Sequence, residues 1–202
     1  GDLRLLPNPL PLEHYHFRAR TPLQPRLLWL RAFHAIYNPA LAAQVVAQLA
    51  AEYPAVHLTM LGPDKGDGSL QSMQQTAAAL GVTNRINQLG AVPKSTIPGW
   101  LDQGDIFLNT TNVDNTPVSI LEAMACGLCV VSTNVGGIPY LATDGHDALL
   151  VDPNDPAAMA NSVRRVLQSS TLAQHLSANA RASAERVDWS AILPQWNQVL
   201  TN

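Results

Sequence analysis

Runs of consecutive apolar residues recur along the chain, separated by segments whose apolar residues fall three and four positions apart. A short unbroken apolar run is typical of a strand buried on both faces, and the wider spacing is typical of an amphipathic helix. The runs predict six strands, at residues 26–30, 56–61, 85–89, 105–109, 129–132 and 148–151. The spaced segments predict helices at residues 39–53, 69–80, 95–101, 117–126, 139–142, 156–168, 172–186 and 190–200.

This alternation of strands and helices predicts an α/β fold with a doubly wound, parallel, six-stranded sheet and helices on both of its faces. Six such strands suit the order 3-2-1-4-5-6, in which the first and fourth strands are neighbours. Ligands bind at the carboxyl ends of the strands at that switch point. We therefore expect the loops at residues 31–37 and 110–117 to lie together and to form the functional site.

Composition indicates one well-packed domain, because 47% of the residues are hydrophobic and only 13% are charged. Residues 27–202 are interpreted as this domain. Residues 1–26 hold five prolines and are interpreted as an irregular lead-in or linker. The net charge of −3, without any basic run, argues against nucleic acid or an anionic membrane as a partner. No apolar stretch approaches the roughly 18 residues of a membrane span, and we expect a cytoplasmic protein.

Cys126 and Cys129 form a C-x-x-C pair. Cys126 is the last residue of a predicted helix, and Cys129 is the first residue of a predicted strand. Redox pairs of this spacing sit instead where a strand enters a helix, whose N-terminus lowers the thiol pKa. A zinc site would need a second pair, which the sequence lacks. We interpret both residues as small, buried, reduced side chains.

The stretch from residue 106 to residue 127 carries the clearest chemistry. A strand is followed by a loop and then by a helix, for which Thr116 is the expected N-cap and Pro117 the first residue. The free amides of such a helix start attract phosphate. Asp114 and Glu122 lie on either side of that start, and their carboxylates can accept hydrogen bonds from sugar hydroxyls.

The same stretch resembles the signature of retaining glycosyltransferases of the GT-B architecture, the family-4-like group 1 enzymes. Their motif has two glutamates separated by seven residues, the second within Leu-Glu-Ala-Met-Ala-x-Gly. Residues 121–127 match the second part around Glu122, and Asp114 replaces the first glutamate. The run of residues 136–139 and the segment 145–153 also match.

The resemblance implies a Rossmann-like domain that binds a nucleotide-sugar donor, with no metal and no other cofactor. The implied reaction transfers a hexosyl group from a UDP- or GDP-sugar to an unknown acceptor. It also implies that an N-terminal acceptor domain is missing, so that this chain alone is inactive. Two alternatives stay open: a UDP-sugar epimerase of the same architecture, and a non-catalytic nucleotide-sugar binding module.

The candidate catalytic residues are Asp114, Glu122 and Arg31, which are expected to meet the transferred sugar, the ribose and the diphosphate. The other candidate donor-binding residues are Val92 (through its backbone, on the base), Pro117, Val118, Ser119, Gly62, His34, Gly136 and Gly137. Similar enzymes carry a lysine six positions after the arginine, where this chain has Tyr37, and a glutamate at the position of Tyr140.

Each candidate also has a simpler reading. Asp114 could cap a turn, Arg31 could pair with a carboxylate, and His34 could be structural. Glu122 could be a surface charge, and the paired glycines could serve backbone conformation and close approach, whether or not a sugar lies there.

The last predicted helix has a continuous apolar face, made of Trp189, Ile192, Leu193, Trp196, Val199 and Leu200. Without the missing domain, this face is predicted to mediate self-association. The alternative is that it packs fully against the helices of its own domain.

Overall fold

The computed structural model describes residues 8–201, and these form a six-stranded parallel sheet in the order β3-β2-β1-β4-β5-β6. The predicted fold class and strand order are therefore confirmed. The strands are β1 (Arg26–Leu30), β2 (His57–Leu61), β3 (Ile86–Gly90), β4 (Ile106–Asn109), β5 (Cys129–Thr133) and β6 (Leu149–Val151).

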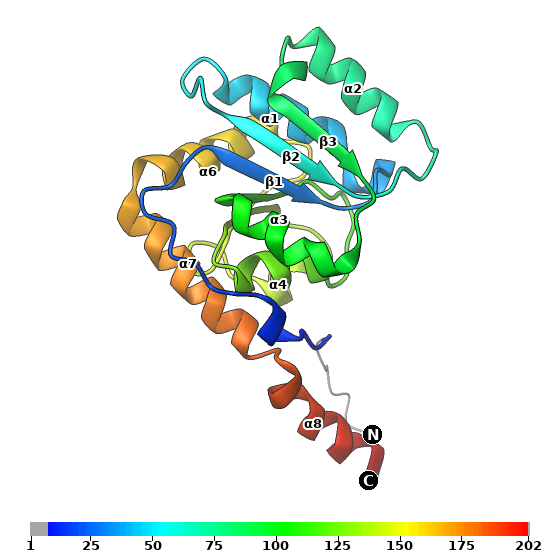
Figure 1. The fold of residues 1–202 in the computed structure, drawn as a ribbon, viewed down its shortest axis with the longest axis vertical. Coiled ribbons are helices and arrows are strands. Elements are labelled where there is room, and N and C mark those ends of the chain that lie inside the picture. The colour runs from blue at the N-terminus through cyan, green and yellow to red at the C-terminus, as the bar shows by residue number, and fades with distance from the viewer. Residues whose placement is uncertain (1–7, 202) are drawn as a thin grey trace.

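Helices connect the strands and cover both faces of the sheet (Figure 1). The α-helices are α1 (Pro39–Leu49), α2 (Ser69–Ala79), α3 (Ile97–Gln103), α4 (Val118–Ala125), α5 (Ile138–Leu141), α6 (Pro156–Gln168), α7 (Ser170–Glu185) and α8 (Trp189–Thr201). Short 3-10 turns are η1 (Leu12–His14), η2 (Ala35–Tyr37), η3 (Thr83–Arg85) and η4 (Lys94–Thr96).

The sheet separates two apolar cores, because successive side chains of a strand point to opposite faces. Leu27 and Trp29 of β1 join the core beneath α1, α2 and α6. Leu28 joins the other core, beneath α3 and α4. Helix α7 contributes to both. The central strands are thus buried on both sides, as predicted, and β4 and β5 are buried throughout. The edge strand β3 is different, because it carries Asn87 and Gln88 and has no fully buried residue.

The carboxyl ends of β1 and β4 are neighbours, and the loops that follow them are tied together. β1 pairs with β2 on one side and β4 on the other. The amide of Asn112 donates to the Ile36 carbonyl at 2.8 Å, and the Thr110 hydroxyl donates to the Tyr37 carbonyl at 2.7 Å. The two loops expected to form the site are therefore adjacent.

Helices α1, α2 and α6 begin at the predicted residues, and the other five begin one or two residues away from the prediction. The N-cap of α4 is Pro117, without a capping side chain, so the expected Thr116 cap is wrong. Asn38, which precedes α1, has a left-handed conformation, and its side-chain Nδ2 donates to Asn154 Oδ1 at 3.0 Å; it makes no capping hydrogen bond to the helix. Ser95 lies within η4, and Thr96 precedes α3. Helix α1 also ends at Leu49, four residues before the predicted end.

The described part of the lead-in, residues 8–25, is largely irregular but packs against the domain. Leu10 and Tyr15 are buried, and the Leu10 amide donates to the Val187 carbonyl at 2.8 Å. The buried Arg20 guanidinium donates through Nε to the Gly104 carbonyl at 2.8 Å. The lead-in is therefore part of the domain's packing, apart from residues 1–7, which lie outside the described part and include Pro7.

Both cysteines are free and buried, as predicted. Burial raises the pKa of Cys126 to about 11 and the pKa of Cys129 to about 12. The thiols are therefore protonated at neutral pH and are poor nucleophiles. Over residues 8–201, no helix is both long and apolar enough to cross a membrane.

The raised thiol pKa values predict a loss of stability at alkaline pH. Below about pH 8.5, both the folded and the unfolded chain keep these protons. Above it, the unfolded chain releases protons that the folded chain retains, so the free energy of unfolding falls as pH rises from about 9 toward the folded-state pKa values of about 11 and about 12. Replacing both residues (Cys126→Ala with Cys129→Ala) should make this fall shallower.

Urea unfolding at several pH values measures how steeply the free energy of unfolding falls with pH. The cavities left by the alanines lower stability equally at every pH, so only the pH dependence is compared. An unchanged slope in the double variant would contradict the assignment of buried, protonated thiols.

Helix α8 projects away from the rest of the domain (Figure 1). Of its apolar face only Ile192 is buried, whereas Trp196 is 39% exposed and Leu193 is 48% exposed. The alternative that this face packs fully against its own domain is therefore wrong. Self-association through α8 stays a prediction.

Replacing Trp196 by Glu is expected to abolish concentration-dependent self-association, because a charge in the apolar face resists burial. Analytical ultracentrifugation over a range of concentrations should show larger species for the parent chain only. Gln195→Glu introduces the same charge at an exposed neighbour and should behave as the parent does. A parent chain that stays monomeric at high concentration would refute the prediction.

Candidate functional site

A pocket of about 430 Å³ lies at the switch point, where the carboxyl ends of β1 and β2 meet the start of α4. The loop after β3 forms its remaining side. Its lining residues are Leu30, Arg31, Ala32, Tyr37, Leu61, Gly62, Pro63, Ala91, Val92, Lys94, Ile97, Val118 and Glu122. Five of the predicted site residues line this pocket: Arg31, Gly62, Val92, Val118 and Glu122.

Arg31 follows β1 directly and is held from two sides. Its guanidinium carbon lies 4.5 Å above the centre of the Tyr37 ring, a cation–π contact. Its Nη2 also forms an ion pair with the Asp114 carboxylate. Burial lowers the pKa of Arg31, although the Tyr37 and Glu122 side chains act in the opposite direction. Arg31 Nε is buried and makes no hydrogen bond with any residue of the described range.

The ion pair gives Asp114 a role that the sequence left open. Its side chain is 12% exposed, and it balances the Arg31 charge across the two loops. Asp114 does not line the pocket itself. The simpler interpretation, in which Arg31 pairs with a carboxylate, thus agrees with the structure.

Gly136 and Gly137 lie against the loop that carries Asp114. A Cβ atom on Gly136 would fall 2.0 Å from the Asp114 carbonyl oxygen, and one on Gly137 would fall 1.8 Å from the Asn115 carbonyl oxygen. The Gly137 amide also donates to the Asp114 carbonyl at 2.9 Å. The close approach that these glycines allow is therefore to the protein's own backbone, and it fixes the Asp114 loop.

Gly62 plays the corresponding part beside Arg31. A Cβ atom there would fall 1.8 Å from the Arg31 carbonyl oxygen, and its φ of 148° is rarely adopted by other residues. Its amide donates to the Gly90 carbonyl at 2.8 Å. Gly62 thus lets the ends of three strands close around the pocket.

The N-terminus of α4 presents uncapped amides next to the pocket. Pro117 supplies no capping side chain, and the first helical bond runs from the Ile120 amide to the Pro117 carbonyl at 3.0 Å. The Val118 and Ser119 amides precede that bond. The buried Ser119 hydroxyl has no hydrogen-bond partner among the described residues. This end of the helix therefore suits an anion.

Glu122 lies on α4, one turn further on, and is only 6% exposed. Its Oε1 accepts a hydrogen bond of 2.7 Å from the hydroxyl of Tyr15, a lead-in residue 107 positions earlier. Burial, together with the Glu122 carboxylate, raises the pKa of Tyr15, so its hydroxyl stays a donor. Sequence reasoning missed Tyr15, because an irregular, proline-rich segment has no periodicity that would place it.

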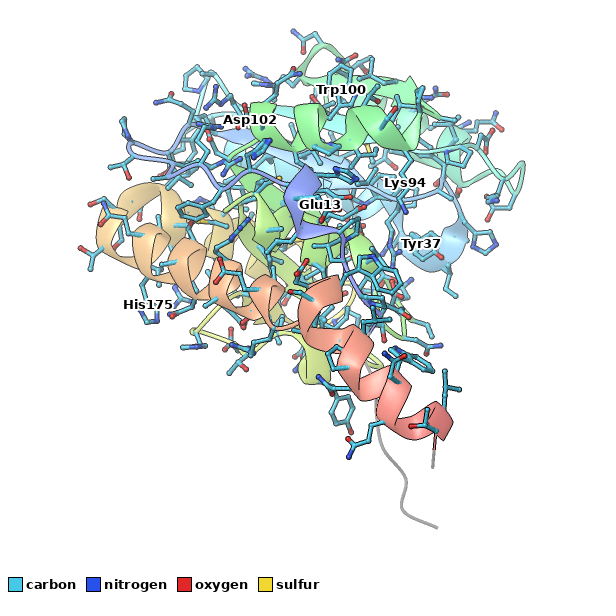
Figure 2. All side chains as sticks on the ribbon, turned by 60° about the horizontal axis from the view of Figure 1, so that its bottom comes forward. Glu13, Tyr37, Lys94, Trp100, Asp102 and His175 are labelled. Carbon is cyan, nitrogen blue, oxygen red and sulfur yellow. The ribbon has the colours of Figure 1, made fainter. Side chains whose placement is uncertain are left out.

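Lys94 is the second residue that sequence reasoning missed. It lines the same pocket as Arg31, and Figure 2 shows it on the same side of the molecule as Tyr37. A second, larger hollow of about 690 Å³ adjoins Lys94, between the lead-in and α3. Lys94 and the Tyr15 side chain take part in the lining of that hollow, together with Glu13.

His34 lies outside the pocket. Its Nδ1 accepts from the Ile36 amide at 3.2 Å and caps η2, and its Nε2 lies 3.7 Å from the Asp67 carboxylate. The structure therefore gives His34 a local structural role. Within residues 8–201, no three His, Cys, Asp or Glu side chains lie close enough to hold a metal ion.

Comparison with known proteins places this geometry in a class. The sequence profile described as "Glycosyl transferases group 1" matches residues 24–169. One relative, the D-inositol 3-phosphate glycosyltransferase of Geodermatophilus obscurus, is 29% identical over 169 residues, which are 81% of this chain and 37% of that protein.

Two solved structures show the same fold. Anabaena Alr3699/HepE in complex with UDP-glucose superposes with a TM-score of 0.87 at 21% identity, covering 98% of this chain and 57% of that chain. The C-terminal domain of the group 1 glycosyl transferase LpcC from Francisella tularensis superposes with a TM-score of 0.73 at 16% identity, covering 89% of this chain and 93% of that chain.

The architecture thus matches the C-terminal, Rossmann-like domain of a GT-B glycosyltransferase. The chain belongs to the glycosyl transferases group 1 family. It spans less than half the length of the curated relatives compared, from 27% to 46%.

Gly137→Ala is expected to lower the free energy of unfolding by about 1–3 kcal/mol, since its Cβ would overlap the Asn115 carbonyl oxygen. Gly99→Ala, within α3, is the control: a Cβ there meets no heavy atom within 4 Å. That change should be neutral or should stabilise the helix by up to about 1 kcal/mol. Denaturant unfolding of both variants measures the difference, and equal stabilities would contradict the close approach.

Proposed function

We propose that this chain is the donor-binding domain of a retaining glycosyltransferase that transfers a hexosyl group from a UDP- or GDP-sugar. The observation that carries the proposal is the pocket at the switch point. It combines a buried carboxylate, Glu122, with Arg31 and with the uncapped start of α4. A nucleoside diphosphate needs this combination, because it presents vicinal hydroxyls at one part and negative charge at the other.

The proposed roles follow from these positions. Glu122 accepts hydrogen bonds from the ribose hydroxyls. The Val118 and Ser119 amides and Arg31 hold the diphosphate and stabilise the charge that develops on it as the sugar departs. Backbone groups at Val92 meet the edge of the base. Gly62 lets the backbone close around the pocket.

Asp114 links the diphosphate to the sugar in this proposal. Its carboxylate pairs with Arg31 in the structure. A bound diphosphate offers Arg31 other acceptors, which frees Asp114 to accept a hydroxyl of the transferred sugar. Gly136 and Gly137 hold the Asp114 loop where it can do so.

The acceptor half of the active site belongs, in this proposal, to a separate N-terminal domain. The relatives are more than twice the length of this chain. UDP-glucose is bound by the similar Anabaena protein. We therefore expect the chain alone to bind nucleotide and to transfer nothing.

Titration calorimetry with UDP, GDP, ADP and CDP tests the donor site. The parent chain should bind UDP or GDP best. Glu122→Gln keeps the shape of the side chain but replaces a charged acceptor by a neutral one. Its affinity for that nucleotide should fall roughly tenfold, about 1.4 kcal/mol.

Glu52→Gln is the matched control, because Glu52 pairs with Arg164 on the surface of α6. It should bind nucleotide as the parent does. Equal affinities of the parent and of Glu122→Gln would show that the carboxylate does not meet the ribose. Sugar transfer to an acceptor by this chain alone would overturn the assignment of a separate acceptor domain.

A further inference from the structure

The contact between the lead-in and the donor pocket has a consequence for nucleotide recognition. The Tyr15 hydroxyl donates to Glu122 Oε1 at 2.7 Å, and the two residues are 3% and 6% exposed. Glu122 also lines the pocket. A carboxylate held at one oxygen in this way has few orientations left to it.

The lead-in backbone around Tyr15 is held by two helices, α7 and α8. Arg181 of α7 donates through Nη1 to the Tyr15 carbonyl at 2.9 Å and to the Ala125 carbonyl, at the end of α4, at 2.8 Å. The lead-in is fastened again at Leu10, whose carbonyl accepts from the Trp189 amide at 3.2 Å. The hydroxyl therefore reaches Glu122 from a supported backbone.

Tyr15 shares this environment with few ionisable groups. Glu122 and the Cys126 thiol act on it electrostatically, and both raise its pKa, as burial does. Arg181 meets only its backbone carbonyl. Over the pH range in which the protein is handled, Tyr15 is thus neutral and donates.

We infer that Tyr15 is a positioning residue for the donor site: its hydroxyl orients the Glu122 carboxylate so that it accepts the ribose hydroxyls. This inference rests on the proposed function. It makes residues 8–25 a working part of the nucleotide site, although they lie outside the strand-and-helix pattern of the domain. A shift of the lead-in would release Glu122 and weaken nucleotide binding.

The decisive experiment compares the parent chain with Tyr15→Phe for two ligands, UDP and an analogue without the ribose hydroxyls. Tyr15→Phe keeps the buried ring and removes only the donor. The dissociation constant for UDP should rise about tenfold, because a hydrogen bond to a charged acceptor is lost. The 2′,3′-dideoxyribose analogue of UDP gives Glu122 no hydroxyl to accept. The parent should bind this analogue with a higher dissociation constant than UDP, and that constant should be the same for the Tyr15→Phe variant.

Tyr53→Phe is the matched control. The Tyr53 hydroxyl, which Gln168 meets at 3.4 Å, lies on the other side of the sheet from the Tyr15 core. Its removal should change neither dissociation constant. Thermal unfolding of each variant checks that the fold is kept.

A double-variant cycle supplies a second test. In the Glu122→Gln variant, the further change Tyr15→Phe should weaken UDP binding by much less than the same change does in the parent. The Tyr15→Phe effect should also be constant from about pH 6 to about pH 9, because the raised pKa keeps the hydroxyl neutral.

The outcomes separate the two proposals. If the parent binds UDP and Tyr15→Phe binds it equally well, the positioning role is wrong, whereas the proposed donor site is still supported. An equal loss for UDP and its dideoxy analogue would also overturn it, since the change would then act on the whole pocket. Failure of the parent to bind any nucleotide of the panel would overturn the proposed function and this inference together.

Discussion

The pairing of β1 with β4 is the constraint on which the site depends. Leu27 and Leu28 of β1 face Ile106 and Phe107 of β4 in register. This pairing reverses the direction in which strands are added to the sheet, and it places the loop after β1 against the loop after β4. Arg31 and Asp114, which lie 83 positions apart in the sequence, meet in an ion pair for that reason alone. The pocket, the glycines that close it and the start of α4 all lie around this junction.

Much of the fold could be predicted from local sequence, because most strands contain a short run of apolar residues with glycine, proline or polar residues nearby. The boundaries of β1 were predicted to the residue, and its neighbours followed from the strand order. Helix starts were harder. Thr116 is a suitable cap by residue type, but the chain takes a non-helical turn at Pro117 and leaves the α4 amides bare. Residue preference cannot decide between those two backbone paths.

The site was predictable where one residue type fits one local structure, and unpredictable where contacts span the chain. Glu122 and Arg31 were identified and line one pocket. Gly136 and Gly137 were chosen for close approach, and the structure adds that the approaching atoms are backbone oxygens of residues 114 and 115. Tyr15 and Lys94 were missed because they come from irregular segments. His34 was drawn into the site by sequence proximity to Arg31, whereas the η2 turn directs it to Asp67.

The strand order also shapes how the chain acquires its fold during synthesis. β1 can pair with β2 as soon as residue 61 has emerged from the ribosome, but its other neighbour, β4, lies about 80 residues further along the chain. Until then, β1 has one open edge, with Leu27, Leu28 and Trp29 among its exposed apolar side chains. Such an edge can pair with another chain, and a pairing over this separation is slow to form. The junction that creates the pocket thus also joins the two central strands that are farthest apart in the sequence, and it can form only after β4 has been synthesised.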